Sequence, residues 1–312
     1  MRVILANPRG FCAGVNMAVD VVDEVLKLFG APVYVYHEIV HNKHVVDGFK
    51  SRGVTFVDAI DEIPPGSLVV YSAHGVSPTV RAESRARKLR EVDATCPLVT
   101  KVHLEVIRFA KQGYQIVFVG HRNHDEAVGT VGEAPDSILV VETPEEVDQL
   151  LVRDPDKLAF VTQTTLSVSD ADRIIGALRF RFPNIKAPPK DDICYATTNR
   201  QNAVTAIAPE VDVVLVIGSI NSSNSKRLVE RAEEQGRESY LIDDVSHLKS
   251  EWLAGKQSVM VTAGASAPDH LVQALLDRLV GEFDGIVETR TLVEEDVYFD
   301  MPKSLKKLAI VG

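Results

Sequence analysis

Two histidines near the amino terminus form the first pattern that suggests chemistry. Residues 37–41 read His-Glu-Ile-Val-His, which matches the H-E-x-x-H signature of zinc proteases. That signature works on a helix, where histidines four residues apart share one face and bind one Zn²⁺ ion. Here Gly30, Pro32 and the apolar residues 33–36 precede His37, an order that predicts a strand after a helix stop. On a strand the two imidazoles would lie roughly 13 Å apart, so the sequence disfavours a zinc protease.

Cys12, Cys96 and Cys194 are the other candidate metal ligands. Each stands just before a helical pattern, and Pro97 suits the first position of such a helix. An odd number of cysteines argues against a disulfide framework. A helix amino end stabilises a thiolate, which favours metal binding. Two forms of the site remain open: zinc with a bound water, or an iron–sulfur cubane in which one iron lacks a protein ligand.

The spacing around the cysteines indicates a threefold internal repeat. Each cysteine is followed, 25 residues later, by a polar residue that ends an apolar strand: His37, His121 and Ser219. A second set of polar residues follows each cysteine by 28 or 29 positions: His41, His124 and Ser223. A second strand of each repeat also ends in a polar residue: His74, Thr164 and Ser266. This equivalence favours a ligand role for the thiols over that of buried small hydrophobes.

Strands that alternate with helices predict parallel sheets, in which ligands bind at the carboxyl ends of the strands. We therefore expect an α/β fold of three similar domains with pseudo-threefold symmetry, and a central cavity that the three cysteines share. The predicted segments are 1–95 with Cys12, 96–193 with Cys96, 194–281 with Cys194, and a C-terminal tail, 282–312. The tail carries no strong motif, and we expect it only to pack.

An iron with an open position can hold a hydroxyl oxygen, and a redox cluster can deliver electrons to the bound molecule. Glu126 lies beside His121 and His124 in the segment HRNHDEAVGT, and its carboxyl is the candidate proton donor to a departing hydroxyl. An iron–sulfur sensor or electron carrier without substrate chemistry is a different class of function that these residues also allow.

Composition excludes several other classes. The net charge of −10 argues against a nucleic-acid partner, because phosphate binding requires a basic surface. No apolar run approaches the ~18 residues of a membrane span. The amino terminus shows neither a signal-peptide pattern nor a transit-peptide pattern, so we expect a cytoplasmic location.

The chain resembles the 4-hydroxy-3-methylbut-2-enyl diphosphate reductases, the family that completes the methylerythritol phosphate route to isoprenoids. The matching segments lie between residues 3 and 269: NPRGFCAGV, HEIVHN, YSAHGVSP, DATCPLVTKVH, GHRNHDE, TQTTLSV, DDICYATTNRQ, GSINSSNS and TAGASAPD. The resemblance implies a trefoil of three α/β domains around one [4Fe–4S] cluster per chain. It implies that Cys12, Cys96 and Cys194 hold the cluster and that one iron lacks a protein ligand.

The implied reaction removes the allylic hydroxyl of (E)-4-hydroxy-3-methylbut-2-enyl diphosphate with two electrons and two protons, giving isopentenyl and dimethylallyl diphosphates. The hydroxyl would bind the open iron, and a protein such as ferredoxin or flavodoxin would donate the electrons. The resemblance assigns catalytic roles to Glu126, as proton donor, and to His124 and Thr164. It assigns substrate binding to His41, His74, His124, Thr164, Ser222, Ser223, Asn224 and Ser266. One position departs from the family pattern: Asp125 stands where proline is common, which bears on the geometry of this loop.

Overall fold

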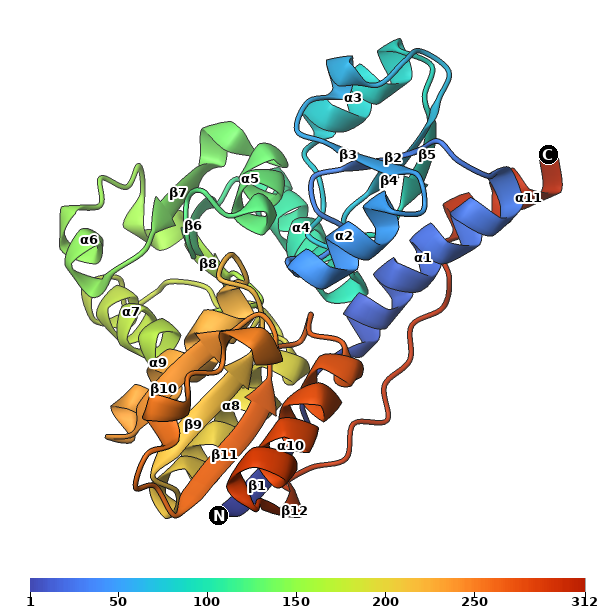
Figure 1. Cartoon of the computed structure of the whole chain (residues 1–312). Coiled ribbons are helices and arrows are strands. Elements are labelled where there is room, and N and C mark those ends of the chain that lie inside the picture. The colour runs from blue at the N-terminus through green and yellow to red at the C-terminus, as the bar shows by residue number, and fades with distance from the viewer. Residues whose placement is uncertain (312) are drawn as a thin grey trace. The chain divides into compact units, whose positions relative to one another are not determined.

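A computed structural model describes residues 1–311, which divide into two compact units (Figure 1). The first unit comprises residues 1–15, 41–48 and 195–298. The second comprises residues 16–40, 49–194 and those from 299 onward. The three sheets are parallel throughout their described strands, as the alternation of strands and helices predicts. The α/β class is therefore confirmed.

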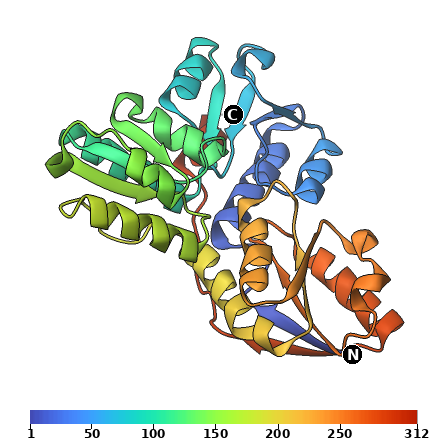
Figure 2. The ribbon, with the colours of Figure 1, turned by 90° about the vertical axis from the view of Figure 1, so that its left-hand side faces the viewer.

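The first unit contains a five-stranded sheet in the order β10-β9-β11-β1-β12. Its strands are β1 (Arg2–Asn7), β9 (Val213–Ile217), β10 (Glu238–Ile242), β11 (Ser258–Ala263) and β12 (Ile286–Thr291). Its helices are α2 (Lys43–Lys50), most of which belongs here, α8 (Tyr195–Ile207), α9 (Ser223–Glu234) and α10 (Asp269–Phe283). Figure 2 shows the blue strand β1 among the orange and red strands from the other end of the chain.

The position of β1 in this sheet joins the first predicted segment, 1–95, to the last two, 194–281 and 282–312. Strand β1 pairs with β11 and with β12, so Arg2 lies opposite both Ser258 and Ile286. The tail 282–312, for which the sequence indicated no role beyond packing, contributes β12 as the edge strand of this sheet. The boundaries 1–95, 96–193, 194–281 and 282–312 stay predictions.

The second unit contains two sheets, in the orders β3-β2-β4-β5 and β7-β6-β8. Their strands are β2 (Val33–Tyr36), β3 (Val54–Val57), β4 (Leu68–Tyr71), β5 (Arg90–Asp93), β6 (Gln115–Val119), β7 (Ile138–Val141) and β8 (Leu158–Thr162). The helices are α1 (Ala13–Phe29), most of which belongs here, α3 (Pro78–Ala86), α4 (Pro97–Lys111), α5 (Asp125–Gly132), α6 (Pro144–Gln149), α7 (Val168–Arg181) and α11 (Lys303–Val311). Short 3-10 helices in the two units lie at Ile60–Glu62, Pro135–Ser137, Pro155–Lys157, Ala208–Glu210, Val245–His247 and Ser250–Leu253.

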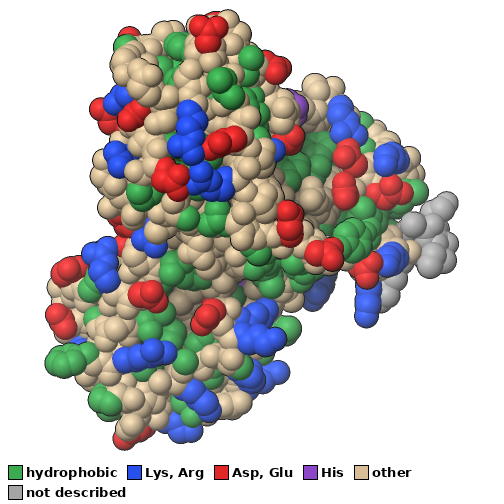
Figure 3. All heavy atoms as spheres, turned by 90° about the horizontal axis from the view of Figure 1, so that it is seen from below, with side chains coloured by type: hydrophobic (Ala, Val, Ile, Leu, Met, Phe, Trp, Pro, Cys, Tyr) green, Lys and Arg blue, Asp and Glu red, His purple; other side chains and the backbone are tan. Residues whose placement is uncertain are grey.

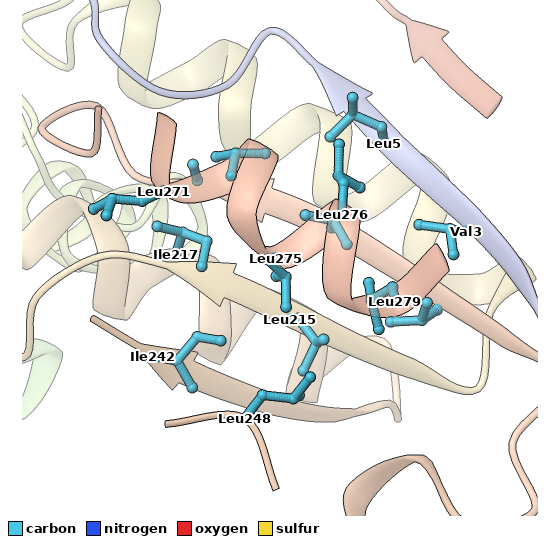
Figure 4. Close-up of a cluster of buried hydrophobic side chains, with 14 of the residues drawn as sticks. Val3, Leu5, Leu215, Ile217, Ile242, Leu248, Leu271, Leu275, Leu276 and Leu279 are labelled. Atoms are coloured by element: carbon cyan, nitrogen blue, oxygen red, sulfur yellow. The ribbon is translucent and has the colours of Figure 1, made fainter. Parts of the chain in front are cut away.

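The strands that helices cover on both faces are continuous apolar runs, because neither side of such a strand faces water. In the first unit, Val3 and Leu5 point to the side of α10, where they join Leu275 and Leu279 in one core (Figure 4). Ile4 packs in a separate cluster, with residues of α8 and α9. In the second unit, clusters on the two faces of the β7-β6-β8 sheet involve α7 and α4, respectively. This burial holds the strands in place, so the polar loops that follow their carboxyl ends start from fixed positions.

On the face that Figure 3 shows, acidic and basic side chains are interspersed over much of the surface. Among residues 1–311, no helix combines the length and the apolar character needed to cross a membrane.

Candidate functional site

Each cysteine lies directly before a helix, as predicted. Cys12 precedes α1, Cys96 is the N-cap residue of α4, and Cys194 precedes α8. Each Cys backbone N–H donates to a carbonyl in the loop after a neighbouring strand. Cys12 donates to Ala265 O at 3.3 Å, Cys96 to Ala73 O at 3.0 Å, and Cys194 to Thr164 O at 3.1 Å.

These three acceptors are Thr164 itself and the residues directly before His74 and Ser266. The loops that end the second strand of each predicted repeat therefore anchor the three cysteines in the same way. The three cysteines, which the spacing predicts to be equivalent, thus make the same backbone hydrogen bond. Each cysteine bonds to the loop of a different predicted repeat: Cys96 to that of the first, Cys194 to that of the second and Cys12 to that of the third.

Glu126 is the most deeply buried of the predicted catalytic residues, with 1% of its surface exposed. Its Oε1 accepts a hydrogen bond from Thr164 N at 2.7 Å, and its Oε2 from Thr164 Oγ1 at 2.8 Å. Burial raises the pKa of the Glu126 carboxyl to about 7, against the opposing effect of the Thr164 hydrogen bonds, and the negative charge of Asp192 raises it further. A carboxyl with such a pKa is half protonated near neutral pH, as a general acid requires.

His124 caps the helix that carries Glu126. Its Nδ1 accepts a hydrogen bond from the backbone N–H of Glu126 at 3.1 Å, which satisfies a free donor of the first turn of α5. An accepting Nδ1 is unprotonated, so the ring proton of His124 resides on Nε2. The cap therefore orients His124 as a hydrogen-bond donor through Nε2.

His74 lies beside His124, with the two ring centroids 5.7 Å apart in an edge arrangement. Glycines of α5 permit this approach: a Cβ on Gly129 would lie 3.2 Å from Gly75 O, and one on Gly132 would lie 2.4 Å from the Ser77 Cβ. The predicted partners of one substrate group, His74 and His124, are thus brought together by close packing of helix on loop.

Asp125, the departure from the family pattern, occupies the first turn of α5 and contacts two histidines. Its Oδ1 lies 2.8 Å from His37 Nδ1, and its Oδ2 lies 3.9 Å from His74 Nδ1. The hydrogen bond to Asp125 raises the pKa of His37, against the effect of burial. His37 adopts a left-handed φ of 58° directly after β2, so the H-E-x-x-H segment is a turn and the strand end is confirmed.

The first unit holds the other predicted substrate-binding residues. Ser222 is the N-cap of α9, and its Oγ accepts from Ser225 N at 3.3 Å. Asn224 contacts the loop after β11 and helix α8: its Oδ1 accepts from Ala265 N at 2.9 Å, and its Nδ2 donates to Thr197 Oγ1 at 3.3 Å. Ser223 begins α9 and is 8% exposed.

Ser266 lies at the carboxyl end of β11, and its Oγ donates to the His41 carbonyl at 2.8 Å. This bond attaches the segment 41–48 to the sheet of the first unit. The amino end of α9 and the Ser266 loop approach closely because Gly264 and Gly218 lack side chains. A Cβ at either position would meet Ser225 Oγ, at 2.0 and 2.2 Å respectively. The amino end of a helix suits an anion, because the helix dipole is positive there.

Arg200 is a residue of this region that the sequence did not reveal. It is fully buried on α8 and donates to the Gly10 carbonyl at 2.7 Å, two residues before Cys12. Its countercharge is Glu295 of the tail, whose Oε1 lies 3.0 Å from Arg200 Nη1. One signal in the sequence could have indicated Arg200: it lies six residues after Cys194, and therefore on the helix predicted to follow that cysteine.

The donor set suits an iron–sulfur cluster better than a zinc protease centre. The three thiols are partly exposed and form no disulfide, each at a helix amino end that lowers the energy of a thiolate. Of the predicted site residues, the first unit contains Cys12, His41, Ser222, Ser223, Asn224 and Ser266. The second unit contains Cys96, Cys194, His74, His124, Glu126 and Thr164.

Comparison with known proteins gives concordant similarities. Residues 3–280 match the model of the family described as LytB protein. A protein of Rhodopirellula baltica named 4-hydroxy-3-methylbut-2-enyl diphosphate reductase is 55% identical, over 99% of this chain and 97% of its own. A protein of Azoarcus sp. with the same name is 54% identical, over 98% of both chains. The solved structure of the E-1-hydroxy-2-methyl-but-2-enyl-4-diphosphate reductase from Plasmodium falciparum has a TM-score of 0.97 and 38% identity, and the match covers 99% of this chain and 98% of that one.

Proposed function

Because the chain belongs to the LytB protein family, we propose that it is an oxidoreductase that converts (E)-4-hydroxy-3-methylbut-2-enyl diphosphate into isopentenyl and dimethylallyl diphosphates. The reaction breaks the allylic C–O bond, consumes two electrons and two protons, and releases water. The observation that carries the proposal is the buried Glu126 carboxyl, whose pKa is raised to about 7 and which contacts the Thr164 hydroxyl. A [4Fe–4S] cluster held by Cys12, Cys96 and Cys194 would supply the electrons and, at an iron without a protein ligand, a Lewis acid.

Glu126 and Thr164 are suited to deliver one proton together. The Thr164 N–H occupies Glu126 Oε1, so the acidic proton of the neutral carboxyl would reside on Oε2, 2.8 Å from Thr164 Oγ1. In that state Oε2 would donate to Oγ1, whereas Oγ1 donates to Oε2 when Glu126 is a carboxylate. When Glu126 passes this proton to Oγ1, Thr164 donates its own hydroxyl proton to the substrate oxygen. The leaving group then departs as water, and Glu126 remains as a carboxylate that both Thr164 hydrogen bonds stabilise.

The diphosphate would be held by neutral donors and a helix amino end, which suits a protein of net charge −10. His124 presents Nε2–H, and the start of α9 presents backbone N–H groups with Ser222, Ser223 and Asn224. His41, His74 and Ser266 complete the proposed set. Hydrogen bonds to a charged group contribute about 1.5–3 kcal/mol each, so a few of them offset the association cost of about 4–15 kcal/mol. An electron-donor protein of the ferredoxin or flavodoxin type and a cytoplasmic location remain predictions.

The test is anaerobic purification followed by iron analysis, a visible spectrum and an assay with the hydroxylated diphosphate and a low-potential reductant. Wild-type protein should be brown and active, and Cys12→Ser, Cys96→Ser and Cys194→Ser should each lose iron. Glu126→Gln should keep the iron and lose most turnover, whereas Glu145→Gln, at an exposed carboxylate of α6, should keep both. An iron-free, fully active protein would refute the proposal, and full activity of Glu126→Gln would indicate that the carboxyl donates no proton.

A further inference from the structure

The segment before Cys194 contains no helix or strand from residue 187 to residue 194, yet it carries one of the proposed cluster ligands. Two hydrogen bonds attach its end to the carboxyl end of β8. Thr162 N donates to Asp192 Oδ2 at 3.0 Å, and Cys194 N donates to Thr164 O at 3.1 Å. The Asp192 side chain is fully buried, and a carboxylate removed from water in this way requires a countercharge close by.

Lys101 supplies that countercharge from the neighbouring helix α4. Its Nζ lies 3.0 Å from Asp192 Oδ1, 2.9 Å from Lys190 O and 2.8 Å from Asp191 O. An ammonium group has three N–H donors, so these three acceptors on consecutive residues use all of them. The segment therefore wraps around one cation, and no apolar side chain of similar length could replace its contacts.

Helix α4 also begins at a proposed cluster ligand. Cys96 is its N-cap residue, and Lys101 lies five residues further along, a rise of about 7.5 Å on a rigid helix. Both cysteines belong to the second unit, and Lys101 joins the helix of Cys96 to the segment of Cys194. Glu105, one turn further along α4, also interacts with Asp192 but carries no positive charge.

We propose that the Lys101–Asp192 contact is a positioning device that sets the Cys194 thiol relative to the Cys96 thiol for cluster binding. The proposal rests on the proposed function, because it concerns ligands of the cluster. Lys101 acts through the loop and is a positioning residue, without a role in the chemistry itself. Its absence would leave Asp192 buried without its cation and the carbonyls of residues 190 and 191 without their donor, so residues 190–194 would lose a single preferred conformation.

The test compares Lys101→Met with Lys111→Met, which removes an exposed lysine from the last turn of the same helix. Hydrogen–deuterium exchange is measured on anaerobically purified protein, together with iron content, the electron paramagnetic resonance spectrum of the reduced protein and its midpoint potential. We expect Lys101→Met to raise amide exchange at residues 190–194 about tenfold or more, with little change in β8 or α4. Its iron should be lost faster to a chelator, and its spectrum and potential should differ from wild type. Lys111→Met should match wild type in all four measurements.

Unchanged exchange at residues 190–194 would overturn the proposal. So would faster exchange with wild-type spectrum, potential and iron retention, since the contact would then stabilise the loop without positioning a ligand. If Lys101→Met does not fold, Asp192→Asn replaces it, because an amide keeps an oxygen for the Thr162 N–H and removes the charge, and the same results are expected. Wild-type protein that contains no iron would refute the proposed function instead, and the exchange comparison would still test the contact.

Discussion

Replacement of Glu126 by glutamine should remove the proposed proton donor and also stabilise the protein at alkaline pH. The wild-type carboxyl is 1% exposed, and burial is the main reason that its pKa rises from 4.5 to about 7. Because the folded-state pKa lies above the unfolded value, the neutral carboxyl contributes stability that is complete below about pH 4.5. That contribution is lost as the pH rises through 7, where the folded protein must bury a carboxylate.

The size of this effect follows from the pKa. At about 1.4 kcal/mol per pKa unit, the rise from 4.5 to about 7 corresponds to about 3 kcal/mol of unfolding free energy between pH 4.5 and pH 8.5. Glutamine is neutral at every pH, and its amide can still accept from Thr164 N and pair with Thr164 Oγ1. The free energy of unfolding of Glu126→Gln minus that of wild type should therefore increase by about 3 kcal/mol across this range.

Urea denaturation of both proteins, prepared identically at pH 4.5, 5.5, 6.5, 7.5 and 8.5, measures that difference. Glu105, whose pKa burial also raises to about 7, is present in both proteins and cancels from the comparison. A difference that stays constant within about 0.5 kcal/mol over the whole range would show that Glu126 titrates normally. The argument that it holds a proton near neutral pH would then fail, and with it the assignment of the donor.

Three further substitutions test contacts around the site. Gly264→Ala should destabilise the protein by about 1–3 kcal/mol in urea, because its Cβ would lie 2.0 Å from a buried serine hydroxyl; Gly281→Ala, on an open helix position, should instead stabilise it by about 0.5–1 kcal/mol, and equal effects would contradict the packing argument. Arg200→Met should lower stability by about 3 kcal/mol or more in the same assay, because it leaves a carboxylate of the tail without its cation and a buried carbonyl without its donor; a loss below about 1 kcal/mol would be inconsistent with that role. Asp125→Asn should lower the pKa of His37, measured by NMR titration of the imidazole, because the carboxylate hydrogen bond is the main cause of its rise; an unchanged midpoint would disprove that contact.

The helix starts and strand ends were predictable because their signals are local. Pro97 after Cys96 marks the first turn of α4, and Gly113, with a φ of 78°, follows its end. The strand that ends before His37 was likewise predictable from four apolar residues. Equal spacing from each cysteine then identified the repeat without any knowledge of packing.

The sheet partners were not predictable, because pairing between strands leaves no mark in the spacing of either strand. Strand β1 precedes Cys12 in sequence but lies between β11 and β12 in the sheet. Part of the tail, β12, is therefore a strand of this sheet. Only this long-range pairing places the Cys12 N–H against Ala265 and explains why Arg200 and Glu295 lie beside the same loop.

The sequence by itself determined the residue types of the site and their order: thiols at helix starts, and polar side chains at strand ends. Only the tertiary structure decided the state of those side chains. The raised pKa of Glu126 results from its burial, and the contact of Lys101 with Asp192 joins residues 91 positions apart. The physical reason is that helix periodicity and capping depend on near neighbours in sequence, whereas desolvation and ion pairing depend on neighbours in space.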